Sequence, residues 1–303
     1  MRQSVVEQLV RTSALLAEAG TRAFGHKGYW HALRLVAKVA PNRLTPVTVN
    51  GMRLEVSMRD PYWLRIVAPG YEYEKEVQEL MLNLAGARFD FVDAGANIGF
   101  WTTFVSRISS DLRILAIEPN PETFVMLKRN TQQLAGDVVL LNAGLVTESV
   151  DFVDLFVPKS GRRHTDGSIV QPRDKREFQR FSVQAFTLDL LLSEYLPESE
   201  CVLLKLDVEG LEKDILRQAE DLGDSRIAII YEDHGFDTHH EASRVLIGSA
   251  FYNVFFLSAG MDPIPVQDSG KLDRLKSEPT RGYNLFAVPN TGIWADHMDR
   301  AFG

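Results

Sequence analysis

The chain has 303 residues, of which 45% are hydrophobic, and its formal net charge is −8. This length allows one large domain with an appendage or two small domains, and the negative charge argues against nucleic-acid binding through the whole surface. Cys201 is the only cysteine, so an intrachain disulfide is excluded and a reducing compartment is expected.

No apolar stretch of the sequence approaches the length that is needed to cross a bilayer. The N-terminal segment is interrupted by the charged residues Glu7 and Arg11, so it does not resemble a signal peptide. These features predict a soluble, cytoplasmic protein without a transmembrane segment.

Residues 3 to about 40 are expected to be helical, because Val6, Leu9 and the apolar residues that follow form a broken helical stripe. We therefore expect residues 1–45 to form an N-terminal helical appendage and residues 46–303 to form the main domain. The apolar stripe predicts packing against that domain or against a second subunit, which would make a homo-oligomer; a cap over the active site is the alternative.

Residues 47–56 alternate around an Asn-Gly pair, which predicts a β-hairpin. A helix with regularly spaced apolar residues is expected soon afterwards. Tyr71 and Glu72 precede it and are candidates for facing a cofactor. Glu74 and Glu76 fall in its first turn, where acidic side chains commonly interact with the helix dipole.

The next stretch contains the strongest functional signal. Residues 89–93 form a short apolar run that ends at Asp93, and Gly95, Asn97 and Gly99 follow before a helical pattern begins. A strand, a glycine turn and a helix in this order are typical of the nucleotide-binding start of a doubly wound α/β sheet. The glycines allow a tight turn and the close approach of a ligand.

This turn differs from the dinucleotide-binding fingerprint, which requires G-x-G-x-x-G. The order here is Gly-x-Asn-x-Gly, and Asp93 precedes the first glycine. An acid at the mouth of the turn suits a cationic or amino-bearing ligand, and S-adenosylmethionine, with its sulfonium and α-amino groups, is such a ligand. A purely structural strand-to-helix turn remains the alternative.

The strand predicted at 112–118 also ends in an acid. Glu118 lies 25 positions after Asp93, close to the offset at which an acid binds ribose hydroxyls in doubly wound folds. An ordinary acid at a strand end is the alternative. The third strand, 138–144, contains Asn142, whose amide is a candidate for contact with an adenine ring.

Residues 150–186 depart from this alternation of strands and helices. Two antiparallel strands, at 150–157 and 181–186, are expected around a loop that is rich in Lys and Arg. The local positive charge indicates an anionic acceptor such as a sugar phosphate, and a solvated insertion is the alternative.

Two further predicted strands end in polar residues. The first, 201–207, ends at Asp207, which we expect near the methyl donor or the acceptor, and the second, 226–234, ends with Glu232 and His234. A base would assist methyl transfer to a hydroxyl, and His234 is the first candidate, followed by Glu232 and Asp207. A supporting or surface histidine is the alternative, and a divalent metal held by the three side chains is another.

The last two predicted strands, 252–257 and 283–288, have matching lengths and are joined by a long loop at 259–281. They can complete the sheet as an antiparallel pair. Such an ending is typical of class I methyltransferases and unusual for nicotinamide-dependent enzymes.

Together these motifs resemble those of the FkbM-type S-adenosylmethionine-dependent methyltransferases over about residues 46–290. The residues that carry the resemblance are Val92-Asp93-Ala94-Gly95-Ala96-Asn97-Ile98-Gly99, Glu118-Pro119-Asn120-Pro121, Thr187-Leu188-Asp189 and Lys205-Leu206-Asp207-Val208-Glu209-Gly210-Leu211-Glu212, with Gly70-Tyr71-Glu72 before them. One departure is Gln218-Ala219-Glu220, where the family often has Gly-Ala.

The resemblance implies a Rossmann-like α/β fold with a seven-stranded, mostly parallel sheet and an antiparallel last strand. It also implies methyl transfer, usually to an oxygen of a sugar, glycolipid or polyketide. We expect Asp93 and the turn from Gly95 to Gly99 to hold the methionyl part of S-adenosylmethionine, with Glu118 on the ribose and Asn142 beside the adenine. The alternatives are a nicotinamide-dependent oxidoreductase and a cofactor-binding or partner-binding protein without turnover.

Overall fold

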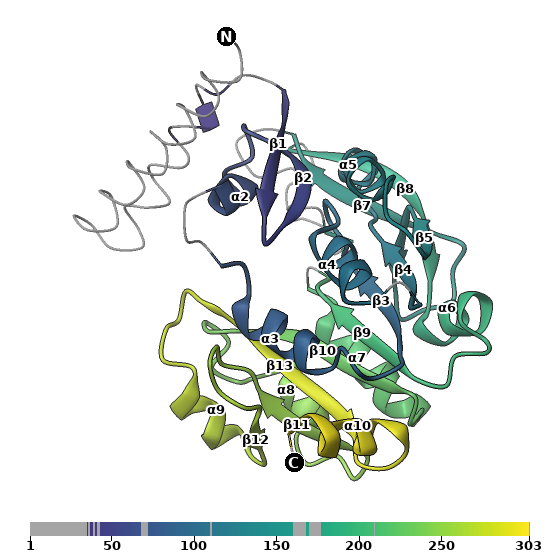
Figure 1. Ribbon diagram of the computed structural model, residues 1–303, viewed down its shortest axis with the longest axis vertical. Helices are drawn as coiled ribbons and strands as arrows, with labels where there is room; N and C mark the ends of the chain where they lie inside the picture. The colour runs from purple at the N-terminus through teal and green to yellow at the C-terminus, as the bar shows by residue number, and fades with distance from the viewer. Residues whose placement is uncertain are drawn as a thin grey trace. The chain divides into compact units, whose positions relative to one another are not determined.

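The computed structural model describes residues 35, 37–38, 40, 43–67, 72–109, 111–159, 168–169, 177–208 and 210–302 (Figure 1). The chain divides into two compact units, one with residues 1–73 and 160–164 and the other with residues 74–159 and 165–303. Most of the predicted N-terminal appendage and most of the basic loop lie outside the described residues. The predicted domain boundary at residue 45 stays a prediction.

The described part of the first unit contains a β-hairpin followed by two short helices. The elements are β1 (Leu44–Val49), β2 (Met52–Ser57), α2 (Pro61–Leu64) and the 3-10 helix η1 (Arg65–Val67). The hairpin prediction is confirmed: β1 and β2 pair antiparallel, and the turn residues Asn50 and Gly51 both have positive φ, as a type I′ turn requires. Asp60 caps α2 by accepting a hydrogen bond from the Tyr62 backbone N–H at 2.8 Å.

The second unit is an α/β structure. Its elements are α3 (Lys75–Asn83), β3 (Asp90–Ala94), α4 (Phe100–Ile108), β4 (Arg113–Ile117), α5 (Pro121–Thr131), β5 (Asp137–Leu141), β6 (Ala143–Leu145), β7 (Phe152–Pro158), β8 (Phe178–Phe186), α6 (Leu188–Tyr195), β9 (Val202–Leu206), α7 (Glu212–Leu222), β10 (Ile227–His234), α8 (Ser243–Leu246), β11 (Tyr252–Phe256), β12 (Ile264–Val266), α9 (Ser269–Leu275), β13 (Gly282–Pro289) and α10 (Ile293–Phe302).

In the described part of this unit, eight strands form one sheet in the order β12-β11-β13-β10-β9-β3-β4-β5. The five strands from β10 to β5 are parallel, and β13 is antiparallel to both β10 and β11. The predicted mostly parallel sheet with an antiparallel last strand, β13, is therefore confirmed. The expected number of seven strands was wrong, because among the described residues the short strand β12 pairs with β11 and adds an eighth. The expected loop at 259–281 was wrong in part, because it contains β12 and α9. With three residues, one of them a proline, β12 is too short to show strand periodicity.

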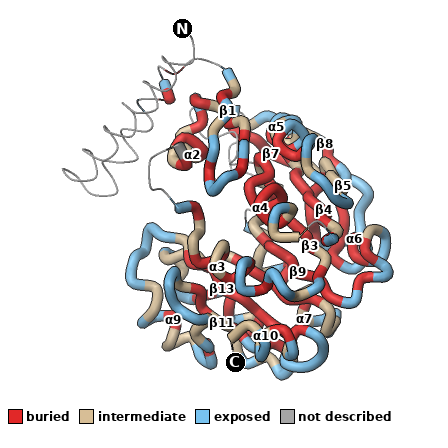
Figure 2. The backbone as a smooth tube through the Cα atoms, in the orientation of Figure 1, coloured by how far each residue is buried: buried red, intermediate tan, exposed pale blue. Residues whose placement is uncertain are grey.

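The sheet is buried on both faces, which is why its central strands are almost continuously apolar (Figure 2). On one face, alternate strand residues such as Val92 and Leu204 share a core with Leu191 of α6, Ile215 of α7 and Leu246 of α8. On the other face, Ala116 packs with Leu127 of α5, and Phe286 contacts Trp294 of α10. These two layers position the carboxyl ends of the parallel strands along one edge.

Within the described residues, a second sheet of three strands follows β5, in the order β6-β8-β7. The predicted antiparallel pairing is confirmed for β7 and β8. The expectation of one continuous strand at 138–144 was wrong, because β5 ends at Leu141 and β6 pairs with β8 instead. Asn142 marks the break, since its side-chain amide is bonded to the backbone after β4.

Candidate functional site

The chain turns sharply between β3 and α4, as the glycine pattern predicts. Gly95, Asn97 and Gly99 all have positive φ, at 84°, 52° and 87°. A Cβ at Gly95 would collide with the backbone carbonyl oxygen of Asp207, and a Cβ at Gly99 would lie 2.7 Å from Leu127 Cδ1. Contacts within the protein are therefore enough to require glycine at both positions. The sequence-based expectation named only the approach of a ligand and the tight turn.

Asp93 lies at the end of β3 and is buried. Its Oδ2 accepts hydrogen bonds from the Thr102 backbone N–H at 2.9 Å and from the Thr102 hydroxyl at 2.6 Å, so it anchors the first turn of α4. Burial raises the pKa of Asp93, although the Thr102 hydrogen bonds and the nearby Lys205 ammonium act in the opposite direction. Its predicted contact with the methyl donor stays a prediction.

Glu118 follows β4, and its carboxylate connects the turn after β3 with the turn after β4. Its Oε2 accepts from the Asn97 backbone N–H at 2.9 Å, and its Oε1 accepts from the Asn120 backbone N–H at 2.8 Å. The side chain is buried, and burial raises its pKa to about 7 despite these two hydrogen bonds. Each oxygen keeps a lone pair that the two N–H groups do not use.

Asn142 connects the end of β5 to the backbone that follows β4. Its Nδ2 donates to the backbone carbonyl oxygens of Glu118 at 2.8 Å and of Pro119 at 3.0 Å. Both amide hydrogens are thus directed to the protein, so a contact with an adenine ring would have to use Oδ1 as an acceptor. The ends of β3, β4 and β5 form one bonded series through Asn97, Glu118 and Asn142.

A buried lysine lies among the acidic strand ends. Lys205 of β9 places its Nζ 3.4 Å from Asp207 Oδ2 and 3.8 Å from Glu74 Oε2, and Trp101 Nε1 donates to the same Glu74 oxygen at 3.0 Å. Burial opposes the charged form of Lys205, but the surrounding carboxylates of Glu74, Asp207, Asp93 and Glu232 outweigh it and raise the pKa.

The sequence pattern predicts no role for Lys205 or Trp101, and it predicts that Glu74 and Glu76 interact with the helix dipole. The assignment was wrong for Glu74, which has φ 43° and reaches Trp101 and Lys205, and it missed that buried Glu76 accepts from Asn284 Nδ2 at 2.9 Å. One signal was present in the sequence, because Lys205 interrupts an otherwise apolar strand and lysine is rarely buried without a partner.

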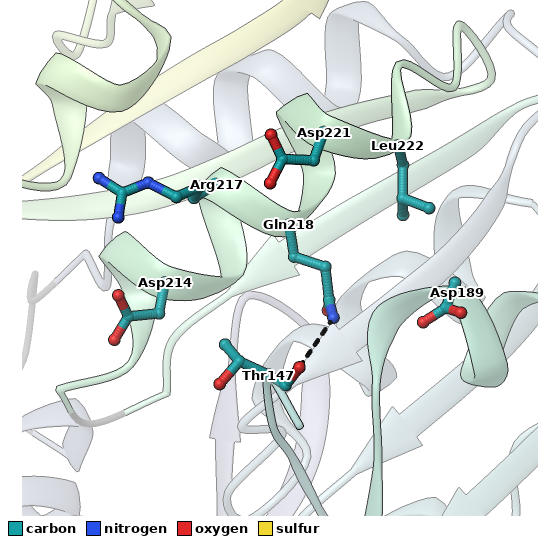
Figure 3. A pocket seen from close by; sticks show the side chains of 7 residues that line it. All are labelled: Thr147, Asp189, Asp214, Arg217, Gln218, Asp221 and Leu222. Carbon is teal, nitrogen blue, oxygen red and sulfur yellow. Dashed lines mark hydrogen bonds between the residues drawn. The ribbon is translucent and has the colours of Figure 1, made fainter. Parts of the chain in front are cut away.

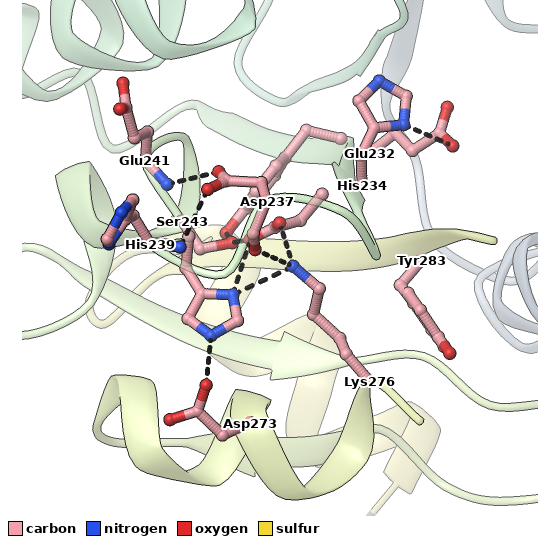
Figure 4. A network of polar contacts seen from close by, with 12 residues as sticks. Glu232, His234, Asp237, His239, Glu241, Ser243, Asp273, Lys276 and Tyr283 are labelled. Atoms are coloured by element: carbon pink, nitrogen blue, oxygen red, sulfur yellow. Dashed lines mark hydrogen bonds and ion pairs between the residues drawn. The ribbon is translucent and has the colours of Figure 1, made fainter. Parts of the chain in front are cut away.

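The end of β10 separates its side chains between two faces. Glu232 and His234 point to one side, where His234 Nδ1 lies 3.3 Å from Glu232 Oε1 (Figure 4). Both side chains are partly exposed. The imidazole also stacks on the exposed Phe236 ring, with centroids 4.9 Å apart and planes inclined by 13°.

Strand alternation directs Asp233 to the opposite side of β10, where it is buried. The polar network on that side includes Ser243, Asp273 and Lys276 (Figure 4). Asp233 pairs with Lys276 Nζ at 2.5 Å and accepts a hydrogen bond from the Ser243 hydroxyl. Lys276 also bonds His240 Nδ1 at 2.9 Å, and His240 Nε2 lies 3.0 Å from Asp273 Oδ1. The network ties β10 to α8 and α9.

Tyr71 and Glu72 are the remaining cofactor candidates from the sequence. Tyr71 lies outside the described residues, and Glu72 is exposed in the first unit, so their contacts with the cofactor stay predictions. Among the described residues, no group of three or more His, Cys, Asp or Glu side chains could hold a metal ion, so the metal alternative gains no support from Asp207, Glu232 and His234. In the same part of the chain, no helix combines the length and apolar character that a membrane span requires.

A hollow of about 450 Å³ lies beside α6 and α7 and is lined by none of the predicted site residues (Figure 3). The departure from the family pattern at Gln218 has a structural explanation here. Its Oε1 accepts from the Leu188 backbone N–H at 2.9 Å, and its Nε2 donates to the Thr147 carbonyl oxygen at 3.4 Å. Gln218 therefore fastens α7 to the first turn of α6. The residues around the hollow are Thr147, Asp189, Asp214, Arg217, Gln218, Asp221 and Leu222.

Comparison with known proteins identifies this architecture. Residues 93–254 match the family described as "Methyltransferase FkbM domain". The "Hexuronic acid methyltransferase AglP" of Haloferax volcanii is 30% identical over 210 residues, which cover 68% of this chain and 79% of that protein. "Methyltransferase 1" of Beauveria bassiana is 31% identical over 144 residues, which cover 43% of this chain and 58% of that protein.

Among solved structures, the tRNA m1G37 methyltransferase of M. jannaschii is similar with a TM-score of 0.42 and 15% identity, covering 84% of this chain and 56% of that chain. The family match spans more than half of the present chain and includes Asp93, Glu118, Asn142, Asp207 and the end of β10. It gives no support to a nicotinamide-dependent oxidoreductase. The chain belongs to the FkbM methyltransferases, and its cofactor is S-adenosylmethionine.

Proposed function

We propose that this methyltransferase transfers the methyl group to a hydroxyl oxygen of a sugar or a similar small acceptor. The contact between His234 and Glu232 at the edge of the sheet carries the proposal, because a carboxylate that orients an imidazole is a suitable arrangement for removing a hydroxyl proton. The name of the relative from Haloferax volcanii, a hexuronic acid methyltransferase, supports the same class of acceptor.

For the donor, the proposal assigns the ribose to Glu118, the adenine side to Asn142 and the methionyl part to Asp93 and the turn from Gly95 to Gly99. The carboxylate of Glu118 fits this role, because each oxygen accepts one backbone hydrogen bond and can accept a second from a vicinal hydroxyl. When bound, S-adenosylmethionine supplies an electrophilic methyl group.

The electrostatics of the edge suit a cationic donor. Four carboxylates, those of Glu74, Asp207, Asp93 and Glu232, raise the pKa of the buried Lys205 ammonium, so acidic side chains outnumber it there. An excess of carboxylates favours a ligand that carries positive charge on its sulfonium and α-amino groups. It favours the product less, because the sulfur is then an uncharged thioether. Asp207 belongs to this acidic group and is included in the proposed donor site.

For the acceptor, His234 takes the hydroxyl proton at Nε2 while Glu232 holds Nδ1. Asp207 is a less suitable base, since Lys205 Nζ already lies 3.4 Å from its Oδ2. Most of the acceleration comes from alignment of the acceptor oxygen with the methyl group, and the proton transfer adds to it.

The test uses isotopically labelled S-adenosylmethionine with a panel of methyl hexosides and hexuronic acids, followed by mass spectrometry of the products. We expect an O-methyl product, and His234→Gln should lower turnover by about 100-fold or more while donor affinity stays near the wild-type value. His239→Gln, which changes an exposed histidine in the next loop, is the matched control. Methylation of nitrogen or carbon, or unchanged turnover of the His234 variant, would contradict the proposal.

A further inference from the structure

Gly282 is the first residue of β13 and lies directly opposite His234 in the antiparallel pairing with β10. It is not among the glycines with positive φ, so its backbone conformation is open to any L-residue. A glycine at the start of a strand is otherwise unfavourable, because it has high conformational entropy and no side chain to pack. Its presence therefore calls for a steric reason.

The steric reason is the side chain of Glu232. A Cβ placed on Gly282 would overlap the Glu232 carboxylate, and the third-nearest atom, Glu232 Cγ, would lie 3.1 Å away. Glu232 and His234 share one face of β10, since they are two residues apart, and Gly282 is the cross-strand partner of His234 on that face. The Glu232 carboxylate thus occupies the volume that a side chain at position 282 would fill.

We propose that Gly282 is a positioning residue: by lacking a side chain, it leaves the space from which Glu232 contacts His234 Nδ1. The contact holds the neutral imidazole in the Nδ1–H tautomer, so that Nε2 is the nitrogen that accepts a proton. This inference rests on the proposed function only in the use of that nitrogen, and the steric part stands without it.

Replacement of Gly282 by alanine tests the inference without destroying the fold. The three atoms nearest to the new methyl group all belong to the flexible end of Glu232, so the carboxylate can rotate away while the strands keep their pairing. We expect the melting temperature and the affinity for S-adenosylhomocysteine to stay close to wild type. Gly86→Ala is the matched control, because no atom lies within 4 Å of a Cβ at that position.

The decisive measurement is the tautomer of His234, read from the ring 15N chemical shifts of 15N-histidine-labelled full-length protein at about pH 8.5, where a typical imidazole is neutral. His234→Gln identifies the signal. We expect the Nδ1–H form in wild type and in Gly86→Ala, and a shift toward the Nε2–H form in Gly282→Ala. In a Glu232→Ala background, the added Gly282→Ala change should have no further effect, since its target is absent.

An unchanged tautomer in Gly282→Ala overturns the inference, and so does a further shift in the Glu232→Ala background. Neither reading requires an acceptor or turnover. If the tautomer shifts as expected while methyl transfer to the acceptor hexoside keeps its wild-type kcat, the role of His234 as the base fails and the positioning role of Gly282 remains. If kcat falls with unchanged KM for the donor, both stand.

Discussion

Replacement of Glu118 by glutamine should make the ligand-free protein less sensitive to pH. Burial raises the pKa of Glu118 from 4.5 to about 7, so the folded protein binds a proton more tightly than the unfolded chain does. This side chain therefore lowers the free energy of unfolding as pH rises from about 4.5 to about 7. Between about pH 5 and about pH 8, the loss is on the order of 2–3 kcal/mol, at 1.36 kcal/mol for each pKa unit.

The measurement is urea unfolding of wild type and Glu118→Gln at both pH values. Taking the difference between the two proteins removes the contributions of the other titrating groups. We expect wild type to lose more stability than the variant over this interval. The control is Glu122→Gln, which removes an exposed carboxylate from the second residue of α5. Parallel pH dependences for wild type and Glu118→Gln would refute the argument.

Glu118→Ala should in addition weaken binding of S-adenosylhomocysteine by about 10- to 100-fold in calorimetry, from the loss of charge-assisted hydrogen bonds to the ribose, and unchanged affinity would count against that role. Lys205→Met should reduce the free energy of unfolding by about 3–5 kcal/mol, because it removes the buried positive charge that lies beside the Glu74 and Asp207 carboxylates. Wild-type stability in thermal and urea unfolding would show that the Lys205 ammonium is dispensable. Gly95→Ala should cost more than about 2 kcal/mol, since it combines a collision with the Asp207 carbonyl and a φ of 84°, whereas Gly86→Ala should cost less than about 1 kcal/mol by the same assay.

The sequence was sufficient for the parallel core of the sheet because each strand is a short apolar run followed by a turn signal. Strand β3 with Asp93 and strand β4 with Glu118 lie where the pattern predicts them. The pattern failed where local signals were short or absent, as in the three-residue strand β12. It also failed at Asn142, where hydrogen bonds to a different strand end, and not local propensity, stop β5.

Long-range contacts limited prediction of the site in the same way. The carboxylates at strand ends were predictable, because parallel strands bring their carboxyl ends to one edge. Their partners were not, since Glu74 and Trp101 are separated from Lys205 by more than a hundred positions and meet it only in the folded chain. The opposed directions of Glu232 and Asp233 followed from strand alternation, but the space at Gly282 depends on β13 lying next to β10.

The buried network around Asp233 bears on how acceptor preference could be redesigned. Lys276 Nζ holds the segment after β10 in place by contacts with Asp233, His240 and the Asp237 carbonyl oxygen. Substitutions among these residues would disorder the whole segment after β10. A change in acceptor preference could then not be separated from the loss of that structure. The exposed ring of Phe236 lies on the outer side of the same segment, beside His234. With His234 as the proposed base, libraries for a changed acceptor range should therefore vary position 236 and keep Lys276 unchanged.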